Sequence, residues 1–174
     1  MHVNILPIGT VDPYILEDFQ EGLGKIFHLK SVSIGKTLPL PEESYDSQRR
    51  QYSSSKILRK LKALKTRKFE LILGVTDVDL YVPELNFVFG EADTLSGVVI
   101  ISLTRLRQEF YGLRADRALF RERAVKEAVH ELGHACGLDH CNHPGCIMYF
   151  SNSINDTDRK GPGFCRLCKE RLGI

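Results

Sequence analysis

Hydrophobic positions along this chain follow two alternating spacings. Short apolar or alternating runs, typical of strands, occur at residues 3–8, 29–34, 69–75, 86–91 and 98–103. Apolar residues recur every three to four positions, as in amphipathic helices, at 12–27, 53–65, 115–136 and 165–172. Alternating strands and helices predict an α/β fold with helices packed on a mostly parallel sheet.

The character of the chain changes at Gly137. Residues 1–137 carry most of the expected strands and helices, and form a predicted N-terminal α/β subdomain that ends in the long helix. Residues 138–174 are rich in Gly, Pro, Asn, Cys and His, and form a predicted irregular C-terminal subdomain. Residues 38–55, with early Leu/Pro alternation and then polar residues, predict an exposed loop.

Length and composition place the chain among globular proteins of one domain, or of one domain with a small appendage. It has 174 residues, 43% hydrophobic and 26% charged, which excludes wholesale disorder. The longest strongly apolar run, 97–103, is far shorter than the roughly 20 residues that span a bilayer. The first residues lack the basic region and cleavage site of a secretory signal, so a cytoplasmic location is expected.

Charge favours neither nucleic acid nor a membrane as a partner. The formal net charge is +2, from 24 basic and 22 acidic residues. Basic residues without any acid do cluster at 56–68, which is typical of either an anion-binding patch or the solvated face of a helix. The balanced total favours the solvated face, so nucleic acid is not an expected partner.

The most informative segment of the long helix is His130-Glu-Leu-Gly-His134. At 100° per residue, His134 lies about 40° around the helix from His130 and one turn further on, so both imidazoles can reach one metal ion. Gly137 is suited to end the helix in a left-handed conformation and to return His140 toward the first two histidines. Asp139 and His143 are alternative third ligands.

Three histidines leave the fourth position of a tetrahedral zinc site for water, as catalysis requires. Zinc lowers the pKa of bound water to about 7. Glu131, beside the first histidine, is then the candidate general base.

All five cysteines follow position 135, and four form two pairs. Cys141 and Cys146 are separated by four residues, and Cys165 and Cys168 by two. Such pairs predict a structural zinc site closed by four thiolates, with two disulfides or idle thiols as the alternative. Together with the histidines they predict two zinc ions per chain. Cys136, the remaining thiol, is expected to be buried and inert.

His130-Glu-x-x-His134-x-x-Gly137-x-x-His140, followed by Met148, resembles the signature of the metzincin metallopeptidases, and the cysteine pattern resembles the archaemetzincins. Residues 79–92 are also similar to that family's segment upstream of the active helix. The resemblance implies a zincin-like fold and zinc-dependent peptide hydrolysis, with His130, His134 and His140 as ligands and Glu131 as base. It further implies that Met148 forms an apolar floor beneath the zinc.

Two further segments each allow two roles. Residues 86–91 are either the edge strand that aligns the substrate or an ordinary half-buried strand. Tyr149 is either an oxyanion stabiliser or a packing residue. The sequence as a whole predicts a zinc metallopeptidase acting on peptides or proteins, with some relatives regarded as aminopeptidases. The alternative is a non-catalytic zinc-binding module for protein or nucleic acid.

Overall fold

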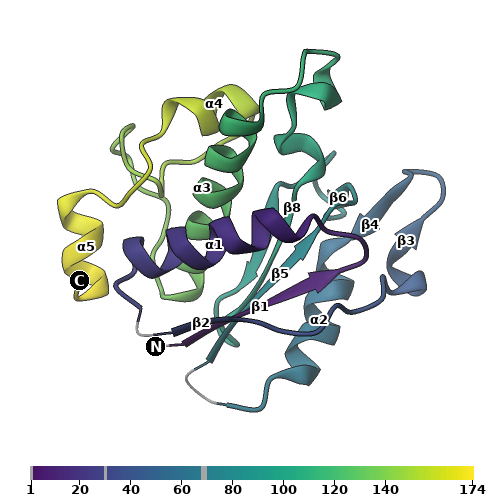
Figure 1. Ribbon diagram of the computed structural model, residues 1–174, viewed down its shortest axis with the longest axis horizontal. Coiled ribbons are helices and arrows are strands. Elements are labelled where there is room, and N and C mark those ends of the chain that lie inside the picture. Colours follow the sequence, from purple (N-terminus) through teal and green to yellow (C-terminus); the bar gives the residue numbers. More distant parts are fainter. Residues whose placement is uncertain (1, 30, 68–69) are drawn as a thin grey trace.

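The centre of the molecule is a five-stranded sheet in the order β2-β1-β5-β8-β7, covered by helices on both faces (Figure 1). The structure is a computed structural model that describes residues 2–29, 31–67 and 70–174. Four strands run parallel, β1 (His2–Ile8), β2 (Ser31–Ile34), β5 (Glu70–Thr76) and β8 (Val98–Ser102), and β7 (Gly90–Asp93) pairs antiparallel with β8. The predicted α/β class with a mostly parallel sheet is confirmed.

Both faces of the sheet are apolar. In β8, Val99 and Ile101 contribute to one buried cluster, while Val98 and Ile100 contribute to a second cluster on the opposite face. The same alternation divides Leu73 from Ile72 in β5. Burial on two sides explains why these strands are continuous apolar runs in the sequence.

Helices α1 (Pro13–Ile26) and α3 (Arg117–Ala135) cover one face, and α2 (Ser54–Leu64) covers the other. Aspartates cap the two longer helices: Asp12 accepts a hydrogen bond from the Tyr14 backbone N at 3.0 Å, and Asp116 accepts one from Leu119 N at 2.9 Å. Two short 3-10 helices, η2 (Thr104–Leu106) and η3 (Gln108–Tyr111), lie between β8 and α3. The predicted bounds of these three helices agree with the structure to within two residues at each end.

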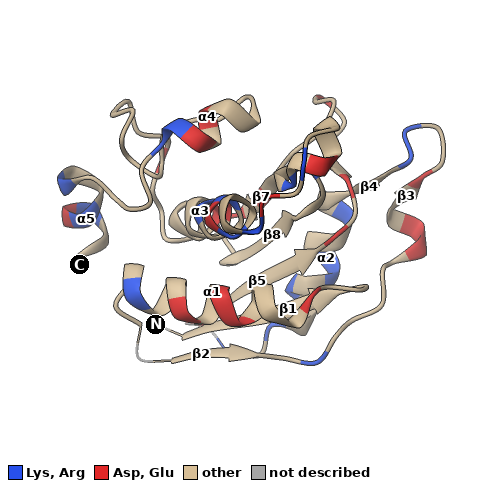
Figure 2. Cartoon of the chain, turned by 45° about the horizontal axis from the view of Figure 1, so that its top comes forward, with Lys and Arg blue, Asp and Glu red and all other residues tan. Residues whose placement is uncertain are grey.

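The basic side of α2 is the solvated face of an amphipathic helix. Ile57 and Leu61 are buried, whereas Lys60 and Lys62 pair at the surface with Glu43 and Asp93, at 2.5 and 3.0 Å. Acidic and basic residues are interspersed over the other helices (Figure 2). Lys68 of the basic stretch lies outside the described residues, as do Lys30 and Phe69 of two predicted strands. Of the helices that the structure describes, none has the length and apolar character to cross a membrane.

The prediction of an exposed loop over 38–55 is wrong in its second half. After the 3-10 helix η1 (Glu42–Ser44), β3 (Tyr45–Asp46) and β4 (Gln51–Ser53) form a hairpin, and β4 pairs in parallel with β6 (Leu80–Tyr81). The Gln51 side chain is buried and donates hydrogen bonds to Asp79 Oδ2 and Asn86 O, both at 2.9 Å. Strands of two or three residues are too short to produce a hydrophobic period.

The prediction of a strand over 86–91 is displaced along the chain. The described strand β7 begins at Gly90, although Phe89 O already accepts a hydrogen bond from Ser102 N at 2.7 Å. The residues before it lie beside the three-stranded sheet of β3, β4 and β6, where Arg49 Nη2 donates a hydrogen bond to Leu85 O at 2.6 Å. β7 is the last strand in the order, so its outer side is an edge of the sheet.

The C-terminal part packs on the same core as α1 and α3. Leu138, Ile147, Met148 and Phe164 are buried in that cluster. A helix that the sequence did not predict, α4 (Ile154–Arg159), begins with a capping box of Ser153 and Asp156, and α5 (Arg166–Leu172) follows as expected. The division into subdomains 1–137 and 138–174 stays a prediction.

Candidate metal centres

Three histidines converge at the end of α3. His130 and His134 project from consecutive turns with their Nε2 atoms 3.2 Å apart, and the ring centroid of His140 lies 5.3 and 4.7 Å from theirs. One ligand atom from each ring lies within 4.8 Å of the others. The alternatives Asp139 and His143 do not belong to this group among the described residues.

Backbone carbonyls orient the first two rings. Nδ1 of His130 lies 2.9 Å from Ile147 O, and Nδ1 of His134 lies 2.7 Å from Leu138 O. A carbonyl only accepts, so each Nδ1 carries the proton and each Nε2 presents its lone pair to the centre of the group. Burial, and next the positive charge of Lys160, lowers the pKa of His130 to about 2, which keeps the ring neutral.

Gly137 has the predicted left-handed conformation, with φ of +89°. The chain leaves α3 through two hydrogen bonds, Gly137 N to His134 O at 2.9 Å and Leu138 N to Gly133 O at 3.0 Å. This is the Schellman arrangement, for which glycine is favoured because it has no Cβ. The turn brings His140 back toward the other two histidines.

Glu131 is buried against the edge strand. Glu131 is 7% exposed. Its burial, and to a smaller extent the negative charge of Glu127, raises the pKa of its carboxyl group well above the usual range. A Cβ on Gly90 would lie only 2.6 Å from Glu131 Cγ and 2.9 Å from Ile100 O. Glycine at position 90 is therefore what lets the Glu131 side chain lie this close to β7.

The histidines and Glu131 face a cleft of about 360 Å³. One wall is residues 85–90, which lead into β7, and another is residues 150–152. Phe150, whose ring centroid lies 4.8 Å from that of His140, lines this cleft, whereas Tyr149 is not among the lining residues. Glu127 and Lys160 complete the lining, and no local pattern in the sequence pointed to Lys160.

Met148 lies fully buried beneath α3. A Cβ on Gly133 would collide with the Met148 sulfur and come within 3.1 Å of its Cε. The glycine within the H-E-x-x-H pattern thus allows the helix to rest directly on this methionine. The apolar position expected for Met148 agrees with its burial.

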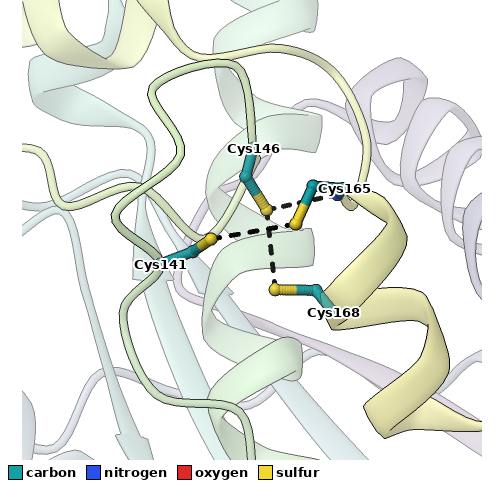
Figure 3. Close-up of side chains that lie close together, drawn as sticks. All are labelled: Cys141, Cys146, Cys165 and Cys168. Carbon is teal, nitrogen blue, oxygen red and sulfur yellow. Dashed lines mark hydrogen bonds between the residues drawn. The ribbon is translucent and has the colours of Figure 1, made fainter.

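Four cysteines form a second group, shown in Figure 3. Cys141 and Cys146 come from the turn after His140, and Cys165 and Cys168 come from the start of α5. The Sγ atoms of Cys141 and Cys165 are 3.8 Å apart, and those of Cys146 and Cys168 are 3.7 Å apart. Both separations far exceed the 2.05 Å of a disulfide bond. The arrangement suits four ligands around one ion better than two disulfides.

The remaining thiol, Cys136, belongs to neither group. It is half-buried near the end of α3, and burial raises its pKa to about 11. A thiol with so high a pKa is largely protonated at neutral pH and therefore a poor nucleophile. This agrees with the inert role expected for it.

A helix with paired histidines, a glycine turn to a third histidine and a methionine beneath them define a zinc metallopeptidase of the metzincin class. The sequence pattern of peptidase family M54 matches residues 17–173, and the chain belongs to this family. It is 41% identical to the archaemetzincin of Methanocaldococcus jannaschii over 172 residues, covering 99% of this chain and 93% of that protein.

Solved structures agree with this assignment. A zinc-dependent peptidase from Methanocorpusculum labreanum matches with a TM-score of 0.90 and 35% identity, covering 98% of this chain and 99% of that one. The archaemetzincin of Archaeoglobus fulgidus, solved with malonate, matches with a TM-score of 0.83 and 39% identity over the same shares. The predicted archaemetzincin resemblance, zincin-like fold and metallopeptidase function are confirmed, and the non-catalytic module is not favoured.

Proposed function

We propose that this chain hydrolyses peptide bonds in the cleft below β7, with His130, His134 and His140 as the ligands of a catalytic zinc. The observation that carries the proposal is the convergence of three imidazoles whose ligand atoms lie within 4.8 Å of one another. Three nitrogen donors suit zinc and leave one position open. When bound, zinc supplies a water of lowered pKa and polarises the substrate carbonyl.

Glu131 is the proposed general base. Its side chain lines the same cleft as the three histidines, and its carboxylate accepts the proton of the attacking water. The same carboxyl then carries that proton to the leaving amine. Its burial supports this role, because a proton transfer shielded from bulk solvent is not lost to water.

The proposed substrate site follows the free edge of β7. An extended peptide can add to such an edge as a further strand, through backbone hydrogen bonds. Residues 85–90 line the cleft and continue into β7, so a peptide on this edge passes close to the histidines. This supports substrate alignment by the segment around Gly90, starting later than residue 86.

We further propose a structural zinc held by Cys141, Cys146, Cys165 and Cys168, and thus two zinc ions per chain. Four thiolates fill a tetrahedral site, so this ion has no open position for water. A hydrogen bond from the Cys168 backbone, as the largest cause, lowers the pKa of Cys165 to about 7, whereas burial raises the pKa of Cys146 and of Cys168. A bound zinc ion would hold all four as thiolates.

The test is hydrolysis of a peptide mixture with free and blocked N-termini by zinc-loaded protein. Cleavage restricted to free N-termini identifies an aminopeptidase, and internal cuts identify an endopeptidase. Glu131→Gln should retain the fold and both metals but lose at least about 10²-fold in rate, the scale of a lost general base. A fully active Glu131→Gln protein would remove this residue from the mechanism.

A further inference from the structure

Lys160, directly after α4, is a buried basic residue with no role in the hydrolysis proposed above. Its side chain is 0% exposed, and its Nζ makes no hydrogen bond to any residue that the structure describes. Its ion-pair partner among the described residues is Glu127, with 3.8 Å between Nζ and Oε2. Burying an ammonium with so few partners is costly unless nearby carboxylates offset its charge.

The other buried basic residues between α3 and α4 are satisfied differently. Arg123 makes two hydrogen bonds of 2.6 Å to the carboxylate of Asp158. Lys126 pairs with Glu122 at 2.7 Å and donates to Thr157 O at 3.3 Å. These contacts fasten α4 to α3 and fix the backbone from which Lys160 extends.

Two carboxylates on α3 face the position of Lys160. Glu127 and Glu131 are four residues apart, so they lie on the same side of the helix. Both are buried, at 4% and 7% exposure, and both line the same cleft as Lys160. Two buried carboxylates on one side of a helix repel each other when both are ionised, unless a positive charge lies near them. Toward β7, Glu131 already packs closely on Gly90, where an added Cβ would lie only 2.6 Å from Glu131 Cγ.

We propose that Lys160 is a positioning residue for hydrolysis, whose buried ammonium offsets the charges of Glu127 and Glu131 and so keeps the Glu131 carboxylate beside the histidines. The proposal rests on the proposed role of Glu131 as base. Lys160 touches neither substrate nor metal in this scheme and acts through the carboxylates alone.

The test is a double-mutant cycle with Lys160→Met and Glu127→Gln, which keep side-chain length while removing charge. Lys160→Met leaves two carboxylates without a counter-charge, and Glu127→Gln leaves the lysine with Glu131 as its remaining carboxylate. We expect each single variant to lower kcat about tenfold, and the double variant to recover to within about threefold of wild type, as for coupled neighbours. KM should change by less than about threefold, since binding contacts are retained.

A readout other than activity follows the Glu131 side chain itself. In crystal structures we expect its carboxylate to move by about 1 Å in Lys160→Met and to return in the double variant, a displacement large enough to matter for catalysis. Zinc content and the thermal unfolding midpoint are measured on all four proteins, with assays performed well below the lowest midpoint.

The outcomes separate the two proposals. Wild-type kcat in Lys160→Met, or a double variant no faster than the slower single one, would show that Lys160 is only a packing residue. An undisplaced Glu131 in Lys160→Met would overturn the inference on structural grounds. If the zinc-loaded wild-type protein hydrolyses no peptide, so that Glu131→Gln has no rate to lower, the proposed function is refuted instead.

Discussion

Replacing Gly90 with alanine adds one methyl group at a point where β7 and Glu131 are in contact. The new Cβ would lie 2.6 Å from Glu131 Cγ and 3.0 Å from its Cδ. It would also lie 2.9 Å from Ile100 O, which is backbone of a central strand and cannot easily give way. The Glu131 side chain must move, by about 0.8 Å for its Cγ to pass from 2.6 Å to the 3.4 Å of an ordinary contact, and the contact with Ile100 O requires a small shift of β7 as well.

The expected consequence is a loss of rate with little loss of structure. A misplacement of about 1 Å at a reacting group can cost about 10²-fold, so we expect kcat to fall about 10- to 100-fold in Gly90→Ala. Overpacking typically costs about 1–3 kcal/mol, which a stable domain tolerates. The zinc content should be unchanged, because none of the three histidines is displaced by the added methyl.

The assay is kcat of zinc-loaded protein on a fluorogenic peptide, beside a matched control, Gly24→Ala. A Cβ on Gly24 meets nothing within 4 Å, and the residue lies inside α1. The control should keep full activity and gain up to about 1 kcal/mol of stability, since alanine is the better helix former. Wild-type kcat in Gly90→Ala, or an equal loss in the control, would refute the reasoning.

Three further outcomes are expected. His134→Ala should lose one zinc ion and all hydrolysis while the chain stays folded, as metal analysis and circular dichroism would show. Cys165→Ser should expose 138–174 to proteolysis and also weaken zinc binding at the histidines, because Cys146 precedes the carbonyl that orients His130; two tightly held zinc ions and a protected tail would contradict this. Gly133→Ala should lower the unfolding midpoint by several degrees, since the added methyl collides with Met148; an unchanged midpoint would contradict it.

Features that depend on local sequence could be predicted from it. Asp12 marks a helix start because an aspartate side chain satisfies backbone groups within three residues. The grouping of His130, His134 and His140 likewise follows from helix geometry and from one glycine that favours a left-handed turn. These arguments need no knowledge of distant contacts.

Features that depend on contacts between distant parts of the chain could not be predicted from the sequence. The hairpin of β3 and β4 is held by Gln51, whose partners are 28 and 35 residues away in sequence. Lys160 faces Glu127 only because α4 is fastened to α3, and α4 is a helix of 6 residues with no apolar period to predict it. Polar residues buried by tertiary contacts resemble surface residues in the sequence.

The contact between Gly133 and Met148 has a consequence for oxidative damage. Oxidation to the sulfoxide would add a polar oxygen to a sulfur that has 0% solvent exposure and lies directly under α3. In the folded chain the helix therefore shields this thioether from oxidants. In a chain oxidised at Met148 before it folds, α3 would be unable to pack against this residue, because the sulfoxide is both larger and polar. Reductive repair of that residue would then have to precede folding.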